Sequence, residues 1–159
     1  MKKNNEKGFT LLELFIVMII IGIIATITLP KMNFQFFKNK LRSSTSAVTS
    51  NLYLARMKAV NNSEEHGVQF LSSGEFYIVK DPLGTSEIVG VRNKLDDGIS
   101  FLNINFVNWL AVFNEQGQLE KTCLPAGVMT GSILLENDIG DSTQVDITFI
   151  SGRIREKNL

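Results

Sequence analysis

The feature that most constrains this chain is an apolar run near its beginning that contains a single acidic residue. Between Phe9 and Leu29 the only ionisable side chain is that of Glu13. Wound as an α-helix, the run would be roughly 31 Å long at about 1.5 Å per residue. A bilayer hydrocarbon core is about 30 Å thick, so residues 9–29 are predicted to form a transmembrane helix. A carboxylate at membrane depth costs at least ~2.5–3.5 kcal/mol on insertion scales, so we expect Glu13 to have a function and a cationic partner.

The apolar run opens with residues 8–13, whose sequence is GFTLLE, and Gly22 and Pro30 follow further along. These residues resemble the N-terminus of type IV pilins and the related pseudopilins. In that family a prepilin peptidase cuts after the glycine on the cytoplasmic side, and the new N-terminal phenylalanine is methylated. The resemblance implies that Gly8 ends a cleaved leader of residues 1–8 and that Phe9 becomes the N-methylated first residue. It also implies that Glu13 meets the N-terminal amine of a neighbouring subunit during assembly.

Two other kinds of N-terminal segment compete with this interpretation. A secretory signal peptide would have a shorter apolar core and a small-x-small cleavage site, for which residues 25–28 (ATIT) are a poor match. A plain signal anchor would account for the length of the run, but for neither Glu13 nor the junction of Gly8 and Phe9. Lysines and arginines flank the run on both sides, so the positive-inside rule is ambiguous and the junction decides the orientation.

Residues 31–61 contain neither proline nor glycine, and they are predicted to continue the helix to about Val60. Pro30 has no N–H, so a kink is expected there, and Gly22 is a second weak point. The resemblance implies that the helix can melt between Gly22 and Pro30 in assembled filaments. The apolar residues of the second half recur at helical spacing and should pack a domain. They are Phe37, Leu41, Val48, Leu52, Ala55 and Ala59.

Residues 61–63 should end the helix, and the remainder is typical of short strands separated by turns. The fold class is therefore α+β, with one long helix packed on an antiparallel β domain that forms two small sheets. We expect a leader at 1–8, a transmembrane helix at 9–29, an amphipathic helix at 30–60 and a β-rich globular domain at 61–159. The predicted strands are 67–71, 75–80, 88–92, 99–106, 109–113, 132–136, 144–150 and 152–155.

The composition offers little support for an enzyme. Cys123 is the only cysteine, so no intrachain disulfide can form, and a small buried thiol is the expected role. His66, the only histidine, follows the helix end and is predicted to lie at the surface. Three acids, Glu136, Asp138 and Asp141, could ligate Ca²⁺, but their spacing is not that of an EF-hand and acids are common in turns. We predict no catalytic residue, no metal and no cofactor.

A second resemblance lies in the last third of the chain. Residues 113–117 (FNEQG), residues 131–137 (GSILLEN) and residues 152–155 (GRIR) are similar to the closing segments of the GspH/FimT group of minor pseudopilins. This similarity implies a minor subunit of a type II secretion pseudopilus or of a type IV pilus, placed at or near the tip and aiding filament initiation. The implied partners are prepilin peptidase, other pilin or pseudopilin subunits, and the inner (cytoplasmic) membrane, which the chain would cross once with its C-terminal domain outside the cytoplasm.

The basic tail suggests DNA as an alternative ligand. Residues two apart in a strand face the same side, so Arg153, Arg155 and Lys157 would project together and could hold phosphates. Members of the FimT type with such a tail are linked to DNA capture in natural transformation. Against this, the formal net charge of the chain is zero, and charged side chains also protect exposed sheet edges from aggregation. An anchored extracytoplasmic enzyme that keeps Met1 is the third alternative.

Overall fold

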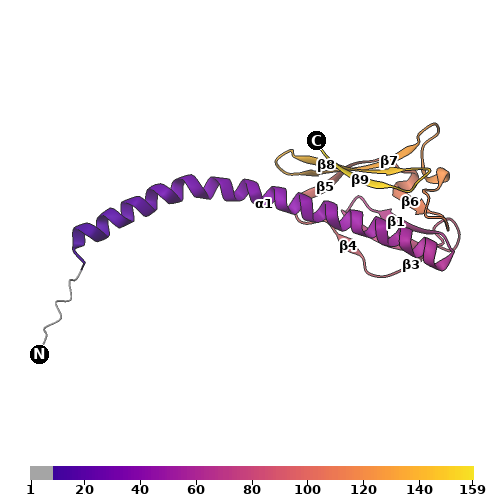
Figure 1. Cartoon of the computed structure of the whole chain (residues 1–159), viewed down its shortest axis with the longest axis horizontal. Coiled ribbons are helices and arrows are strands. Elements are labelled where there is room, and N and C mark those ends of the chain that lie inside the picture. Colours follow the sequence, from indigo (N-terminus) through magenta and orange to yellow (C-terminus); the bar gives the residue numbers. More distant parts are fainter. Residues whose placement is uncertain (1–8) are drawn as a thin grey trace, which may run out of the picture. The chain divides into compact units, whose positions relative to one another are not determined.

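The structure is a computed structural model that describes residues 9–159, including the side chains of all of these residues except 27–33. The predicted leader with Gly8 lies outside the described residues, as does the side chain of Pro30. The chain divides into two compact units, Met1–Phe36 and Phe37–Leu159. Helix α1 (Leu11–Asn62) begins in the first unit and ends in the second (Figure 1).

Helix α1 ends where the sequence predicts. Ser63 adopts a left-handed backbone conformation, with a φ of 52°, directly after the last helical residue. The N–H of Glu64 then donates a hydrogen bond of 3.3 Å to the carbonyl of Ala59. This bond closes a Schellman-type cap, which satisfies a carbonyl that the end of a helix would otherwise leave without a partner.

The predicted apolar stripe of the second half of α1 is confirmed. Leu41 is 5% exposed, and four further members of the stripe are fully buried, whereas Phe37 is half-buried at the start of the unit. Burial of one face at this spacing is what anchors the helix to the strands. The four fully buried residues are Val48, Leu52, Ala55 and Ala59.

The first sheet contains five antiparallel strands in the order β3-β2-β1-β6, with β4 also paired to β2. Two of its strands are only two residues long, and a short 3-10 helix η1 (Val107–Trp109) leads into β6. The strands are β1 (His66–Phe70), β2 (Glu75–Lys80), β3 (Glu87–Ile88), β4 (Asn93–Lys94) and β6 (Leu110–Phe113).

The second sheet contains four antiparallel strands in the order β5-β7-β8-β9, so β5 and β9 form its edges. A second 3-10 helix, η2 (Lys121–Cys123), connects the two sheets along the chain. The strands are β5 (Ile99–Ile104), β7 (Thr130–Asn137), β8 (Ser142–Thr148) and β9 (Ile154–Asn158). The buried side chains of both sheets and of α1 form one hydrophobic core, which confirms the predicted α+β fold with two small sheets.

Two strand predictions were wrong in ways that have physical reasons. The predicted strand at 88–92 is interrupted, because Gly90 has a φ of 98°, which a regular strand does not contain. The predicted last strand at 152–155 begins later, at Ile154, because Gly152 has a φ of 58° and belongs to the turn between β8 and β9.

Polar contacts supplement the core by fastening α1 to the loops and strands beside it. They are spread over four turns of the helix, and each joins a helix side chain to a residue distant in sequence. The pairs are Lys40 Nζ to the Asp97 carbonyl (2.9 Å), Ser44 Oγ to Asp96 Oδ2 (3.1 Å), Asn93 Nδ2 to Asn51 Oδ1 (3.2 Å) and Tyr53 Oη to the Ile154 carbonyl (3.3 Å).

Candidate functional site

The first turn of α1 presents Glu13 on an exposed surface and is capped by Thr10. The Thr10 hydroxyl oxygen accepts a hydrogen bond of 3.2 Å from the backbone N–H of Glu13. The Thr10 carbonyl accepts two more, from the N–H groups of Glu13 and Leu14 at 3.1 and 3.2 Å. Thr10 is therefore the N-cap and Glu13 the third helical residue, the residue spacing of a capping box. Sequence reasoning missed the role of Thr10, although the Thr-x-x-Glu pattern before an apolar run signals it.

The helix that follows Glu13 exposes its apolar side chains on all sides. The large apolar side chains from Phe9 to Ile24 are 46 to 85% exposed, so the described part of this chain does not bury them. Within the residues whose side chains are described, no helix is long and apolar enough to cross a membrane. The predicted transmembrane segment includes residues 27–29, whose side chains lie outside that description.

Gly22 lies within the helical part of this segment. A Cβ built on Gly22 would meet no atom within 4 Å, so packing within the described chain does not require a glycine there. The helix is continuous from Leu11 to Asn62. The predicted weak point at Gly22 and the predicted kink at Pro30 stay predictions.

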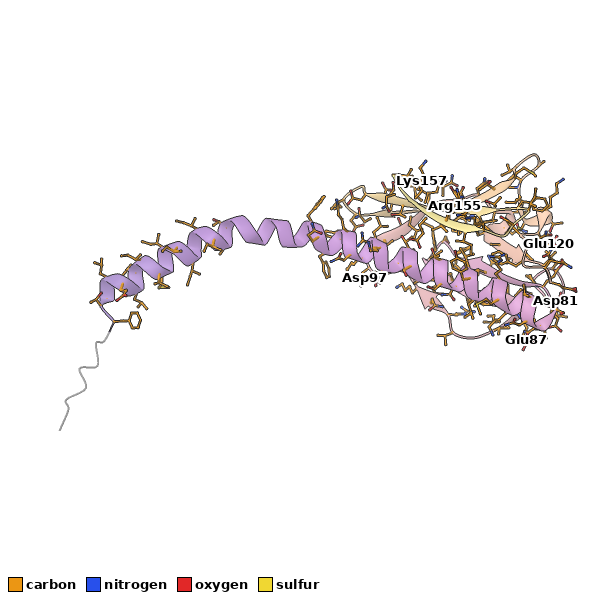
Figure 2. All side chains as sticks on the ribbon, viewed as in Figure 1. Asp81, Glu87, Asp97, Glu120, Arg155 and Lys157 are labelled. Carbon is orange, nitrogen blue, oxygen red and sulfur yellow. The ribbon has the colours of Figure 1, made fainter. Side chains whose placement is uncertain are left out.

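In the tail, the structure brings two of the three predicted basic residues together. Arg155 and Lys157 occupy alternate positions of β9 and therefore share a face, opposite to that of the buried Ile154. Both are labelled in Figure 2. Asp146 of β8 stands directly beside Arg155, so one acid partly offsets the positive charge of this face. Arg153 lies before the strand, where its N–H donates a hydrogen bond of 3.2 Å to Ser151 Oγ.

A contact that sequence reasoning missed fixes the turn before these basic residues. The Arg56 side chain donates from Nε to the Gly117 carbonyl at 2.8 Å and from Nη2 to the Ser151 carbonyl at 2.9 Å. A Cβ on Gly152 would overlap the same Gly117 carbonyl oxygen. We call Arg56, Gly117, Ser151 and Gly152 the arginine clasp. The clasp explains why a glycine precedes the basic tail, and no local pattern signals it because Arg56 lies 61 and 95 residues from its acceptors.

The prediction that His66 lies at the surface was wrong. His66 is fully buried in β1, the strand between β2 and β6. Its Nδ1 lies 3.0 Å from the Glu64 carbonyl, so Nδ1–H is the donor, while Nε2 has no hydrogen-bond partner among the described residues. The strand extends further towards the helix end than predicted because Gly67 lets β6 approach: a Cβ there would lie 2.6 Å from the Ala111 carbonyl oxygen.

Cys123 is a buried thiol, as predicted. It is 3% exposed, and its Sγ lies 2.8 Å from the Glu120 carbonyl, to which the thiol donates. Burial raises the pKa of the Cys123 thiol above its usual range. Because the thiolate is the nucleophile, this environment makes Cys123 unreactive rather than activated.

The raised pKa of Cys123 gives a testable prediction. At pH 8 iodoacetamide should alkylate the native chain more slowly than the urea-unfolded chain, because burial raises the pKa of the Cys123 thiol and lowers its thiolate fraction. Intact mass spectrometry over time measures both rates, with Cys123→Ser as the blank. Because the unfolded thiol ionises first as pH rises, the contribution of Cys123 to stability should decrease above a pH of about 8.5. Equal alkylation rates in the two states would contradict the buried environment.

The acids considered as Ca²⁺ ligands lie around the turn between β7 and β8. Asn137 holds this turn, because its Oδ1 accepts hydrogen bonds from the N–H groups of Ile139 at 3.2 Å and Asp141 at 2.9 Å. Among the residues that the structure describes, no group of three histidine, cysteine, aspartate or glutamate side chains is placed to hold a metal ion.

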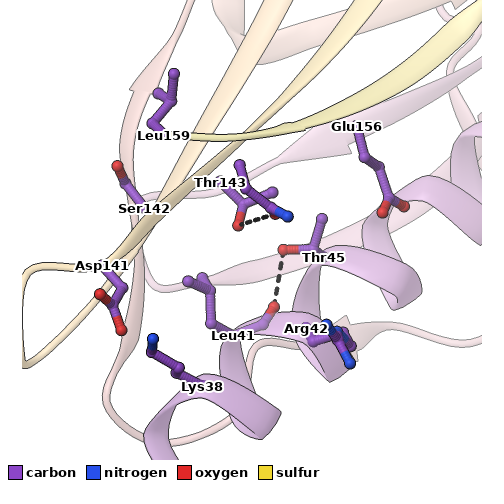
Figure 3. A pocket seen from close by; sticks show the side chains of 10 residues that line it. Lys38, Leu41, Arg42, Thr45, Asp141, Ser142, Thr143, Glu156 and Leu159 are labelled. Carbon is purple, nitrogen blue, oxygen red and sulfur yellow. Dashed lines mark hydrogen bonds between the residues drawn. The ribbon is translucent and has the colours of Figure 1, made fainter.

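A groove of about 470 Å³ lies between α1 and the ends of β8 and β9 (Figure 3). One wall is formed by α1, where Leu41 and Thr45 alternate with two basic side chains. The other wall is formed by the two strands and the turn before β8 and contributes two acids, so charges of both signs line the groove. Its charged residues are Lys38, Arg42, Asp141 and Glu156.

Comparisons with known proteins agree with both resemblances found in the sequence. Residues 3–29 match the family described as prokaryotic N-terminal methylation motif. None of the curated proteins matches the chain. The structure resembles that of the minor pseudopilin EpsH from the type 2 secretion system of Vibrio cholerae, with a TM-score of 0.59 and 9% identity over 75% of this chain and 97% of that one.

The structure also resembles that of the type IV minor pilin FimU of Pseudomonas aeruginosa. The TM-score is 0.55, with 16% identity over 76% of this chain and 90% of that one. The N-terminal motif and the fold together confirm the predicted resemblance to type IV pilin-like proteins and to the minor pseudopilins.

Proposed function

We propose that this chain is a minor pilin or pseudopilin, a structural subunit of a type II secretion pseudopilus or of a type IV pilus. Prepilin peptidase removes residues 1–8, Phe9 is then N-methylated, and the subunit aids filament initiation from a place at or near the tip. The chain crosses the inner (cytoplasmic) membrane once, and its C-terminal domain lies outside the cytoplasm. The role is structural, without a catalytic step or a cofactor. The matched methylation motif and the fold support this proposal.

One observation carries the proposal furthest: an exposed acid at the start of an exposed apolar helix. Glu13 and the large apolar side chains around it are exposed in the isolated chain, so something outside the chain must cover them. A bilayer covers apolar side chains but not a carboxylate. The ammonium of Phe9 on a neighbouring subunit would neutralise Glu13. The apolar helix of the same neighbouring subunit would cover the exposed apolar side chains.

Processing at Gly8–Phe9 is the direct test. We expect protein recovered from native membranes to start at N-methylated Phe9, as measured by intact mass and N-terminal sequencing. The Gly8→Asp variant should remain uncut, start at Met1 and fail to enter filaments, while Asn5→Asp serves as a control that keeps the junction. A parent chain that starts at Met1 would refute the pilin assignment and leave a signal-anchored domain. A chain that starts after Leu29 would mean secretion and would also refute the proposal.

DNA binding is the second candidate function, favoured by the shared face of Arg155 and Lys157. Neither residue forms an ion pair within the described part of the chain, so both can reach phosphates. The affinity of the full chain in detergent for duplex DNA should decrease with salt, and Arg155→Ala/Lys157→Ala should lower the salt slope by about 2. Lys94→Ala, on β4, is the matched control. Equal DNA retention at low salt by the parent and the double variant would exclude this candidate.

A further inference from the structure

The edge strand β9 has one backbone edge that is paired and one that is open. At its two ends the hydrogen bonds to β8 run from the Thr148 N–H to the Arg153 carbonyl at 3.0 Å and from the Leu159 N–H to the Ser142 carbonyl at 3.2 Å. Antiparallel strands alternate between hydrogen-bonded and non-hydrogen-bonded pairs. Arg155 and Lys157 therefore bond to β8, whereas Ile154, Glu156 and Asn158 direct their N–H and C=O groups away from it.

Only part of this outer edge is covered. The Tyr53 hydroxyl donates a hydrogen bond of 3.3 Å to the Ile154 carbonyl, which closes one end of the edge against α1. The backbone groups of Glu156 and Asn158 have no partner within the described residues. Both residues line the groove beside α1, where Figure 3 shows Glu156. The open edge therefore borders a cavity of about 470 Å³.

The charges of β9 disfavour a second copy of this chain on that edge. When two β9 strands pair antiparallel about a two-fold axis, the outer-face residues of one strand stand opposite the outer-face residues of the other. On this strand they are Arg155 and Lys157, so basic side chains would face each other in the registers centred on Arg155, Glu156 or Lys157. Like charges directly opposite one another destabilise a strand pair. Acidic side chains at those positions of an added strand would instead stabilise it.

We propose that the open edge of β9 binds an extended segment of a different polypeptide with acidic residues at alternate positions, by β-strand addition. The added strand hydrogen-bonds to Glu156 and Asn158 through its backbone. Its acidic side chains stand beside Arg155 and Lys157, and its remaining side chains enter the groove above Arg42 and Thr45. The proposal rests on the proposed function only in that the segment would then belong to another filament subunit.

Hydrogen exchange of single amides tests the geometry. In the full chain, in detergent and labelled for NMR, the amides of Arg155 and Lys157 should exchange slowly and those of Glu156 and Asn158 quickly. The probe is a seven-residue synthetic peptide of alternating valine and glutamate, and the control peptide has lysine in place of glutamate. The glutamate peptide should slow exchange at Glu156 and Asn158, and the lysine peptide should not. Slow exchange at Glu156 and Asn158 without peptide, or equal effects of both peptides, would overturn the proposal.

Matched variants separate the backbone from the side chain. Glu156→Pro removes the open N–H while leaving the ladder to β8, because proline is tolerated on the free side of an edge strand. Glu156→Ala keeps that N–H. Peptide affinity should decrease at least about tenfold in Glu156→Pro relative to Glu156→Ala. Equal affinities would refute strand addition. If Glu156→Pro fails to fold, the exchange pattern and the Arg155→Glu/Lys157→Glu variant still test the proposal.

Reversal of the outer charges tests the specificity. Arg155→Glu/Lys157→Glu should lose the glutamate peptide and gain the lysine peptide. If the parent instead binds duplex DNA and neither peptide, the basic face is a phosphate site and the strand-addition proposal is wrong. Processing at Phe9 is read on the same preparations by intact mass. A processed chain without peptide binding therefore refutes this inference alone, whereas an unprocessed parent chain refutes the proposed function.

Discussion

Replacing Gly152 by alanine should lower the free energy of unfolding of the Phe37–Leu159 unit by about 3 kcal/mol. The φ of 58° at Gly152 is a left-handed conformation that costs an alanine roughly 1–2 kcal/mol. The new Cβ would also overlap the Gly117 carbonyl oxygen and press on Arg56 Nε at 3.1 Å. Overpacking of this kind typically costs about 1–3 kcal/mol. The midpoint of thermal unfolding should fall by about 10 °C, measured by the fluorescence of Trp109, the single tryptophan.

Gly140→Ala is the matched control for this substitution. Gly140 also has a positive φ, 87°, but a Cβ there would meet no atom within 4 Å. Only the backbone term remains, so the loss should be about 1–2 kcal/mol. Equal losses in the two variants would show that the arginine clasp does not constrain Gly152. Arg56→Met, which removes both hydrogen bonds but keeps much of the side-chain volume, should be less stable than the parent and should tolerate Gly152→Ala better.

Glu13→Ala should abolish entry into filaments while leaving cleavage after Gly8 intact. At membrane depth the Glu13 carboxylate costs at least ~2.5–3.5 kcal/mol unless a cation neutralises it. The proposed pairing with a neighbouring subunit supplies that cation and so favours assembly. Without the carboxylate, the amine of Phe9 on the neighbouring subunit loses its partner. Sheared filament fractions and membrane fractions, compared by immunoblot, measure incorporation. Entry of Glu13→Ala at the parent level would contradict the proposed pairing.

Two variants separate the charge of Glu13 from its place in the helix cap. Glu13→Asp keeps the negative charge and should retain partial incorporation. Thr10→Val removes the hydroxyl that accepts from the Glu13 N–H and should cost the helix about 1 kcal/mol. Incorporation should therefore survive Thr10→Val. A loss as complete as in Glu13→Ala would assign the effect to helix capping rather than to the charge.

Local sequence patterns predicted most of the fold. The buried stripe of α1 was predictable because 3.6-residue spacing brings Leu41, Val48 and Leu52 to one face. The helix end was predictable because two asparagines and a serine favour a left-handed cap. The end of the strand predicted at 88–92 was not predictable, because Gly90 breaks the strand and Asn93 is held by the distant Asn51. Such long-range contacts leave no local signal.

The candidate site also contains some features that local sequence patterns predict and others that depend on long-range contacts. Residues 8–13 form a contiguous motif, so Phe9 and Glu13 could be singled out, and Thr10 could have been from its spacing to Glu13. The alternation that brings Arg155 and Lys157 to one face follows from the geometry of any strand. The arginine clasp and the buried position of His66 depend on how separate elements pack. Neither the clasp nor the burial of His66 can be predicted from residues that are neighbours in the sequence.

The spacing of the polar contacts along α1 has a mechanical consequence. A pull on the helix towards its N-terminus would try to slide it lengthwise past the strands. The contacts at successive turns would then share the tension and would have to break together, rather than being peeled one after another. We therefore expect the domain to resist stretching along α1 better than stretching across it. The helix residues that share the tension are Lys40, Ser44, Asn51, Tyr53 and Arg56.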